Sequence, residues 1–306
     1  MASEARRVRG EAQKNIVKAF ERLCGKHGRW EVWADWVTMS ACSISNAVDQ
    51  AHAEKREDIY RALQKKYTAV EMQTMGEMLG MVIMALEENP DQDLLGDIFM
   101  TLGLGNEHNG QFFTPYNVCC VMSALNSEHS AAEVERRGWI AVADPACGAG
   151  ALLVSFANEC IRQKINYQTD VLFVGQDIDF TVGMMCYIQL SLLGCPGYIV
   201  IGDTLAHPAT CIDRRGLIPK DEGNVWYTPM FFRDVWSWRK VWAQLDLLSM
   251  NQTKGKDNSQ PLSKEPLGPD KEAIKGAGME RAEQKPKAAA QRLIFSENKH
   301  GQLVLF

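Results

Sequence analysis

The feature that most constrains the fold is a short apolar segment followed by a glycine-rich turn and a helical stretch. The apolar segment runs from Trp139 to Ala143, and Asp-Pro-Ala-Cys-Gly-Ala-Gly follows it as residues 144–150. A helical pattern then begins at Ala151. Glycine permits a tight backbone turn and close approach of a ligand to the main chain. This order predicts a buried strand, a ligand-binding turn and a helix.

The same alternation continues downstream. Residues 171–174 (Val-Leu-Phe-Val) and 198–201 (Tyr-Ile-Val-Ile) predict two further strands, and helical patterns cover about 151–163 and 180–193. Strands that alternate with helices imply right-handed crossovers and a parallel sheet. The predicted fold class is therefore α/β, with a Rossmann-like domain.

The first part of the chain predicts a helical bundle. Apolar side chains recur at helical spacing, and a long apolar stretch ends where Pro90 stops it. Three tryptophans, Trp30, Trp33 and Trp36, are expected to pack as one stripe into the core.

The last part of the chain has a different composition. Residues 251–290 contain no aromatic residue and are rich in Lys, Glu, Gln, Pro, Gly and Ala. Such a segment buries too little apolar surface to offset the entropy of ordering. The predicted organisation is a helical domain (1–105), a sheet-containing domain (106–248), a disordered linker (249–300) and a terminal peptide (301–306).

Composition narrows the classes of function. The net charge of −5 gives no broad basic surface, although a local patch would suffice for DNA. The nine cysteines include no C-x-x-C pair, so we expect reduced thiols and no metal site. The start has no apolar signal region, and no apolar run approaches a membrane span of about 18 residues. These patterns predict a cytoplasmic protein without membrane contact.

Residues 144–150 resemble the first cofactor motif of amino-DNA methylases, specifically the adenine-N6 group. That group includes the modification subunits of type I restriction–modification systems. Residues 110–115 (Gly-Gln-Phe-Phe-Thr-Pro) strengthen the resemblance, because in the family this segment precedes the motif and folds over the methionine end of the cofactor. Residues 93–96 (Asp-Leu-Leu-Gly) are also family-like in position.

The resemblance implies S-adenosylmethionine as cofactor. Asp144 would accept hydrogen bonds from its ammonium group, and Asp203 from its adenine amino group. Asp177 would hold the ribose hydroxyls, with Asp179 as the alternative. A nicotinamide dinucleotide fits less well, because Leu153 stands where its phosphate loop prefers glycine. The predicted cofactor-binding residues are Phe113, Thr114, Pro115, Asp144, Ala146, Cys147, Gly148, Gly150, Asp177 and Asp203.

Each strand-end acid also has a simpler interpretation. An aspartate in such a place is often a turn residue or a helix N-cap, and a glycine-rich turn can form without any ligand. The argument for a cofactor is that the acids follow successive strands, where ligands bind in open α/β sheets.

The catalytic motif of the family, Asn-Pro-Pro followed by Tyr or Phe, is absent from the chain. In the family, the amide and a proline carbonyl accept hydrogen bonds from the target amine, and the ring stacks on the flipped base. Residues 207–210 lack both groups, whereas Asn224 and Tyr227 keep the amide and the ring without the prolines. They are candidate catalytic residues. The alternative is that the aromatic residues between 226 and 242 cap the sheet.

The sheet is also expected to be truncated, because few residues separate Thr204 from the tail. Three hypotheses follow. The chain is a DNA adenine-N6 methyltransferase, or an inactive cofactor-binding module that modulates replication or host defence. The third hypothesis is a subunit that works only with a specificity subunit or a second methylase chain.

The last residues resemble the Q-L-x-L-F peptide that binds the bacterial sliding clamp. Leucine and phenylalanine side chains would fill an apolar pocket, and the glutamine would hydrogen-bond at its rim. The predicted clamp-binding residues are Gln302, Leu303, Leu305 and Phe306. Such a tether would place the enzyme on newly made DNA. The alternative is an edge strand on the folded domain; residues 291–295 are a looser version of the peptide.

Overall fold

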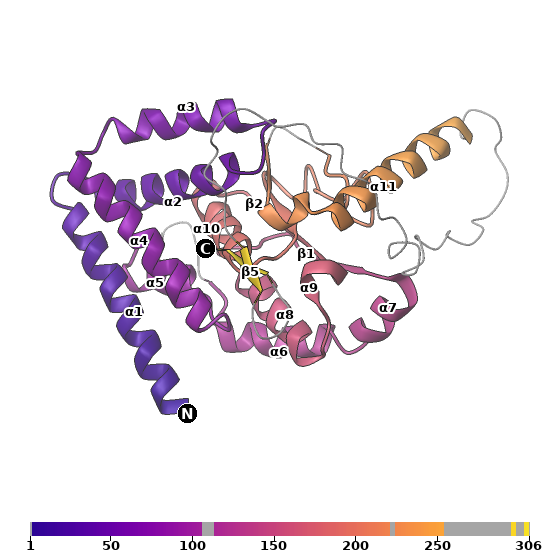
Figure 1. Cartoon of the computed structure of the whole chain (residues 1–306), viewed down its shortest axis with the longest axis horizontal. Helices are drawn as coiled ribbons and strands as arrows, with labels where there is room; N and C mark the ends of the chain where they lie inside the picture. The colour runs from indigo at the N-terminus through magenta and orange to yellow at the C-terminus, as the bar shows by residue number, and fades with distance from the viewer. Residues whose placement is uncertain (1, 106–112, 221–223, 254–294, 298–302, 306) are drawn as a thin grey trace.

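The computed structural model describes residues 2–105, 113–220, 224–253, 295–297 and 303–305. These residues form a mixed α/β structure (Figure 1), in which one group of helices lies beside a small sheet.

The predicted N-terminal helices are present. They are α1 (Ala2–Leu23), α2 (Arg29–Asn46), α3 (Ala53–Gln64), α4 (Ala69–Glu88) and α5 (Leu94–Thr101). α4 begins at a capping box, in which the Thr68 hydroxyl accepts from the Glu71 N–H and the Glu71 carboxylate accepts from the Thr68 N–H. Trp33 and Trp36 on α2 are fully buried, as expected, but Trp30 is partly exposed and meets the edge of Phe99.

These helices share one hydrophobic core with the sheet. The Trp33 indole lies 3.4 Å from the sulfur of Met185, which belongs to the helix that follows the second strand. The buried Arg56 guanidinium donates to the Val225 carbonyl at 2.7 Å, on the last strand of the sheet. The N-terminal helices therefore pack against the α/β part rather than standing apart as a bundle.

One helix in the described part of the chain, α4, is long and apolar enough to cross a membrane by length and composition. The sequence alone predicted no apolar run of this length. Its buried residues, Met75, Met78, Val82, Ala85 and Leu86, belong to the shared core. A core helix meets the same criteria.

The main sheet has the order β1-β2-β3-β4. β1 (Ile140–Asp144), β2 (Val171–Asp177) and β3 (Gly197–Ile201) are parallel, and β4 (Val225–Tyr227) is antiparallel to β3. The three predicted strands and their parallel arrangement are confirmed. The remaining helices are α6 (Tyr116–Asn126), α7 (Ser130–Arg137), α8 (Ala151–Arg162), α9 (Tyr167–Asp170), α10 (Phe180–Leu192) and α11 (Asp234–Thr253).

Two apolar layers cover the sheet. α8 and α10 pack on one face as part of the shared core. On the other face, Leu172, Val174, Tyr198 and Val200 pack in a second cluster. Aromatic residues of that cluster come from β4, from the short helix η3 (Pro229–Phe232) and from the start of α11: Tyr227, Phe231 and Trp236. The capping interpretation is confirmed for these three, whereas Trp238 and Trp242 are exposed on α11.

β1 differs from the prediction of a buried strand. It lies at the edge of the sheet, and its residues alternate between half-buried and exposed. Ile140 and Val142 pack on the shared core, while Ala141 and Ala143 are exposed because the second cluster covers β2, β3 and β4 but leaves these two residues uncovered. Strand order is a tertiary property, so the apolar composition of 139–143 did not reveal the edge position.

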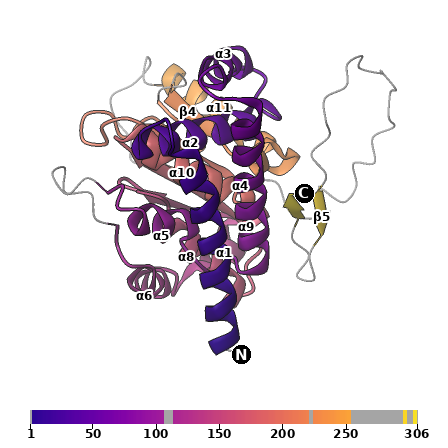
Figure 2. The same ribbon diagram turned by 90° about the vertical axis from the view of Figure 1, so that its left-hand side faces the viewer.

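The end of the chain contains a second, two-stranded sheet. β5 (Phe295–Glu297) and β6 (Leu303–Leu305) pair in antiparallel fashion, as a separate pair in Figure 2. β5 falls inside the predicted linker 249–300, and α11 extends to Thr253, beyond the predicted boundary at 248. The rest of that linker lies outside the described residues.

Candidate functional site

The carboxyl ends of the three parallel strands bring the predicted acids to one edge of the sheet. Asp144 ends β1, Asp177 ends β2, and Asp203 follows β3 after Gly202. The register pairs Asp144 with Gly175, and Asp177 with Ile201. In open α/β sheets this edge is where ligands bind.

The glycine-rich turn between β1 and α8 uses the conformations that only glycine adopts easily. Gly148 has φ 55° and Gly150 has φ 97°. A Cβ atom on Gly150 would lie 2.8 Å from the Cys186 sulfur, which is too close. Gly150 also forms the N-cap of α8. The turn therefore depends on glycine both for its backbone angles and for its contact with α10.

Asp177 fixes this turn to the second strand. Its Oδ2 accepts a hydrogen bond from the Gly148 N–H at 2.9 Å, and its Oδ1 accepts from the Asp179 N–H at 3.0 Å. The Cys147 N–H donates to the Gln176 carbonyl at 3.0 Å. The carboxylate expected to hold the ribose thus also positions the motif beside it.

A small pocket of about 200 Å³ opens between these strand ends. Its lining residues are Pro145, Ala146, Asp177, Ile178, Gly202, Asp203 and Thr204. Asp177 lines the pocket, whereas Asp179 is not among the lining residues and caps α10 by accepting from the Val182 N–H at 3.0 Å. The pocket therefore favours Asp177 over Asp179 as a ligand-binding acid. Asp203 remains exposed and accepts from the Leu205 N–H at 2.8 Å.

The surroundings of Asp144 disfavour the charged form of its carboxyl group. Burial raises its pKa above the ordinary value for aspartate, and the negative charge of Asp177 raises it further. A hydrogen bond from the Ala146 N–H at 3.1 Å acts in the opposite direction. A cationic group placed beside Asp144 would relieve the repulsion and favour the charged carboxylate. The site is therefore suited to a ligand that carries positive charge.

The upstream motif reaches the same turn. The ring of Phe113 is half-buried, stacks on Phe99 with centroids 5.4 Å apart, and lies 3.5 Å from the position that a Cβ of Gly148 would occupy. Thr114 and Pro115 are exposed, and Pro115 is the N-cap of α6. Residues 110–112 lie outside the described residues. Segments far apart in sequence thus meet at the turn, as the resemblance implied.

Cys147 faces the interior. Its side chain is buried, and its sulfur would lie 3.1 Å from a Cβ atom placed on Gly175. Only its backbone faces the turn, so its predicted part in cofactor binding is limited to the main chain. Ala146 is exposed and lines the pocket.

The two candidate catalytic residues, Asn224 and Tyr227, lie at the opposite edge of the sheet from β1. Tyr227 is buried, and its ring stacks on Phe231 with centroids 5.2 Å apart. Asn224 is exposed just before β4, whose Val225 pairs with Val200. Three strand spacings separate β1 from β4, or roughly 14 Å. The structure therefore gathers the acids but does not bring Asn224 or Tyr227 next to Asp144.

Sequence reasoning missed two buried glutamines that hold the site together. On β2, the Gln176 side chain donates to the His207 carbonyl at 2.9 Å and accepts from the Ala209 N–H at 2.9 Å, which fixes the loop after β3. On α10, the Gln189 side chain donates to the Ala149 carbonyl at 2.7 Å. The signal available was a glutamine inside an otherwise apolar segment, because a buried amide must find partners.

Gln189 also explains the family-like segment 93–96. Its side chain donates to Asp93 Oδ1 at 2.8 Å and accepts from the Leu95 N–H at 3.2 Å. Asp93 caps α5 by accepting from the Gly96 N–H, and a Cβ on Gly96 would overlap the Asp93 carboxylate. The N-terminal helices are thus hydrogen-bonded to the glycine-rich turn through one glutamine.

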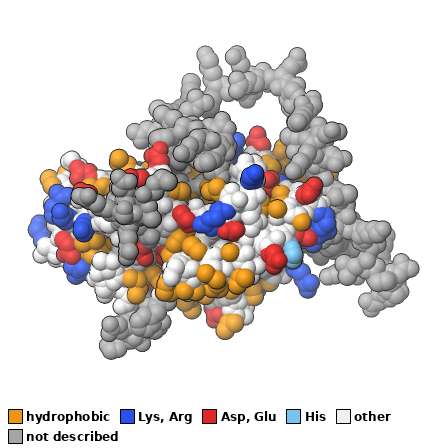
Figure 3. Space-filling view, turned by 90° about the horizontal axis from the view of Figure 1, so that it is seen from below, with side chains coloured by type: hydrophobic (Ala, Val, Ile, Leu, Met, Phe, Trp, Pro, Cys, Tyr) orange, Lys and Arg blue, Asp and Glu red, His pale blue; other side chains and the backbone are white. Residues whose placement is uncertain are grey.

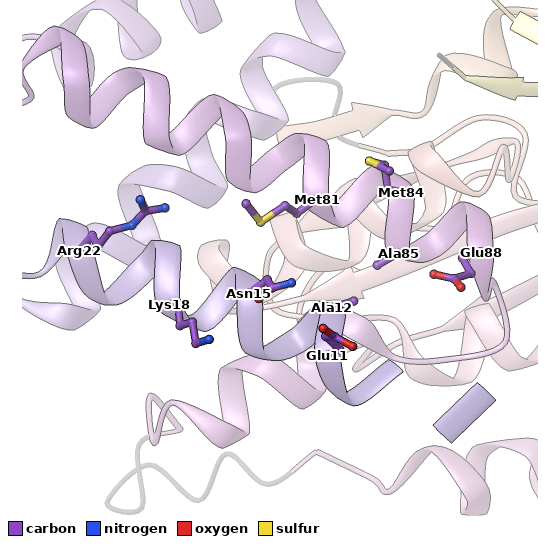
Figure 4. A pocket seen from close by; sticks show the side chains of 9 residues that line it. All are labelled: Glu11, Ala12, Asn15, Lys18, Arg22, Met81, Met84, Ala85 and Glu88. Atoms are coloured by element: carbon purple, nitrogen blue, oxygen red, sulfur yellow. The ribbon is translucent and has the colours of Figure 1, made fainter. Parts of the chain in front are cut away.

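A larger hollow lies elsewhere. A groove of about 810 Å³ runs between α1 and α4 (Figure 4). Its lining residues are Glu11, Ala12, Asn15, Lys18, Arg22, Met81, Met84, Ala85 and Glu88. None of the residues that line this groove lies at the end of a strand, so the smaller pocket is the better candidate site. Within the described ranges, no cluster of His, Cys, Asp or Glu has the arrangement of a metal site.

Comparisons with known proteins give a match at the level of family only. No curated protein and no solved structure matches the chain. Residues 91–225 do match a family model, and this range runs from just before α5 to the first residue of β4. The matching family is N-6 DNA Methylase, and the match supports an N-6 DNA methylase relationship for this part of the chain.

Proposed function

We propose that the chain is the cofactor-binding part of a DNA adenine-N6 methyltransferase that uses S-adenosylmethionine, of the kind found in type I modification subunits. The observation that carries this proposal is the pocket at the carboxyl edge, where Asp177 and Asp203 lie beside the glycine turn. The family match supports methyl transfer to DNA.

The residues present fit that cofactor. Asp144 provides negative charge for the ammonium group, and burial together with the charge of Asp177 raises the pKa of its carboxyl. Asp177 keeps a carboxylate at the pocket wall for the ribose hydroxyls, and Asp203 is open for the adenine amino group. When bound, the cofactor supplies an electrophilic methyl group on a sulfonium.

The chain's own residues position these groups. Gly148 donates its N–H to Asp177, so the turn and the ribose-binding acid move together. Gln189 holds the Ala149 carbonyl, which keeps the turn against α10. The half-buried ring of Phe113 packs beside Gly148 and stacks on Phe99.

Calorimetric titration of the full chain with S-adenosylmethionine tests the cofactor assignment. We expect binding by the wild type and its loss in Asp144→Ala and Gly148→Val, with Gly103→Ala as a control in a solvent-open turn. Folding of each variant is checked by circular dichroism. Equal affinity in all four folded proteins would refute the site.

The second candidate function is an inactive cofactor-binding module. This function is favoured by the position of Asn224 and Tyr227, which lie at the edge of the sheet opposite to Asp144. Transfer of labelled methyl to unmethylated duplex DNA separates the two functions. Incorporation into adenine supports the enzyme, whereas cofactor binding without incorporation supports the module or an incomplete subunit.

We also propose that the last residues bind the bacterial sliding clamp. What supports this is the sequence from Gln302 to Phe306, together with the extended backbone of β6, which pairs with β5 in a sheet separate from the main one. Gln302 and Phe306 lie outside the described residues. Deletion of 302–306 should abolish clamp binding in fluorescence anisotropy and leave cofactor affinity unchanged. Equal clamp affinity of both proteins would refute the tether.

A further inference from the structure

β1 has a hydrogen-bonded neighbour on one side only. Within the described ranges, it pairs with β2, and its other edge has no strand beside it. Parallel strands are normally buried on both faces, and an open edge presents unpaired N–H and C=O groups. Ala141 and Ala143 are exposed on the uncovered face of β1. This edge therefore has the properties of an interface that a further strand would complete.

The helix layer beside β1 carries an exposed apolar stripe. Val118, Val121, Met122 and Leu125 follow one another at helical spacing on α6, and all four are exposed. The opposite side of α6 packs on α8, where the Ser123 and Ser155 hydroxyls lie 2.6 Å apart. Figure 3 views the molecule from the side where α6 lies in Figure 1, and hydrophobic side chains gather across the middle of that face. Contiguous exposed apolar side chains of this kind mark an interaction site.

The other layer also offers apolar surface near β1. Arg239 on α11 donates to the Gly138 carbonyl, just before β1, and its guanidinium lies over the Trp139 ring. From there α11 exposes Trp238, Val241, Trp242, Leu245 and Leu248. Exposed apolar helical surface therefore lies near β1 on both faces of the sheet, on α6 and on α11.

The order of the acids indicates what the free edge lacks. With Asp177 as the acid for the ribose and Asp203 as the acid for the adenine, Asp144 on β1 would be left for the amino-acid end of the cofactor, and the methyl group would face β1. In doubly wound sheets the ligand lies at the point where strand order reverses, between the first strand and its neighbour on the other side. This chain provides the strands on one side of that point. The amine that receives the methyl group must then approach from the free side of β1.

We propose that the β1 edge and the α6 stripe dock a second polypeptide, which adds a parallel strand beside β1. At the end of that strand it carries the amide and aromatic groups that hold the target amine. This inference rests on the proposed function.

A second copy of this chain fits the site less well. Pairing two β1 edges would join two cofactor sites and supply neither with an amide at β1. The chain's own tail also fits poorly, because residues 251–306 contain no Asn-Pro-Pro segment followed by Tyr or Phe. An incomplete site thus favours a different chain, one that contributes the missing groups.

Photo-crosslinking in cells that naturally produce the protein tests this docking. Benzoylphenylalanine is placed at position 125 on α6, or at position 70 on α4 as a matched control. Leu125 and Val70 are both 74 % exposed. We expect crosslinking only from position 125, to a polypeptide whose sequence includes Asn-Pro-Pro-Tyr or Asn-Pro-Pro-Phe. The purified pair should transfer labelled methyl to adenine at least tenfold faster than either chain alone.

Charge variants provide the second arm. Leu125→Asp should lower both complex formation and methyl transfer at least tenfold, and Val70→Asp should change neither. A crosslink to a second copy, to the chain's own tail, or to nothing would overturn the proposal, as would a partner that adds no activity. S-adenosylmethionine affinity of the isolated chain is measured in parallel. Loss of that affinity would count against the proposed function, whereas normal affinity without docking would count against this inference alone.

Discussion

The glycine turn can be tested quantitatively at Gly150. An alanine there must adopt φ near 97°, where a non-glycine residue costs about 1–3 kcal/mol. Its Cβ would also lie 2.8 Å from the Cys186 sulfur and 3.3 Å from the Cys186 Cα. Overpacking of a buried site costs a further ~1–3 kcal/mol. Gly150→Ala should therefore lower the free energy of unfolding by about 2–6 kcal/mol.

The control is Gly103→Ala. Gly103 has φ 66°, and no atom lies within 4 Å of the position of its Cβ. In this variant the left-handed backbone conformation alone should lower the free energy of unfolding, by about 1–2 kcal/mol, because no neighbouring atom is crowded. Urea unfolding followed by circular dichroism measures both variants, and calorimetry measures their affinity for S-adenosylmethionine. If Gly150→Ala destabilised the protein no more than Gly103→Ala, the close contact between the turn and α10 would not be what requires glycine.

Three further predictions concern the residues around the site. Gln189→Leu removes the hydrogen-bond partner of the Leu95 N–H and of the Ala149 carbonyl. The free energy of unfolding should therefore fall by about 2–5 kcal/mol. Urea titration measures it, and an unchanged unfolding midpoint would contradict this prediction. Arg56→Ala should cost about 3–5 kcal/mol, because the buried Asp49 carboxylate loses the guanidinium that contacts it at 2.8 Å and is left with the half-buried His52 ring; the exposed Arg61→Ala is the control. Asp144→Asn should raise stability at neutral pH while cofactor binding is lost. Because the folded-state pKa of Asp144 is raised, its charged form destabilises the fold as pH rises above the unfolded pKa. Thermal unfolding of wild type and variant should thus converge below that pH and diverge above it, and parallel profiles would refute the burial argument.

Local sequence signals predicted the elements that carry the site. The alternation of apolar segments with helical patterns predicted β1, β2 and β3, because short buried strands and amphipathic helices have distinct periodicities. The acids after these strands then had to meet at one edge, since parallel strands end on the same side. The glycines of the turn were recognisable for the same local reason.

Tertiary properties were not accessible in this way. The apolar composition of residues 139–143 is equally compatible with a central strand and an edge strand, so the exposure of Ala141 and Ala143 was missed. The pairing of β4 with β3 likewise depends on a long connection, and it placed Asn224 away from Asp144. Gln189 bonds to Asp93, almost a hundred positions earlier, and no local pattern indicates that contact.

The electrostatics of the site impose a condition on how DNA reaches it. Asp144, Asp177 and Asp203 form an acidic edge on a chain whose net charge is −5, and phosphate groups are repelled by such a surface within a Debye length of about 10 Å. On the proposed function, the same charge favours the cationic cofactor, so removing it should weaken cofactor binding. The affinity for DNA must then come from elsewhere: a docked second chain with basic groups, or a tether that raises the effective concentration of DNA to the millimolar range. On this argument, removing residues 302–306 should weaken methylation of clamp-loaded DNA more at 50 mM salt than at 200 mM, because salt screens the repulsion that the tether has to overcome.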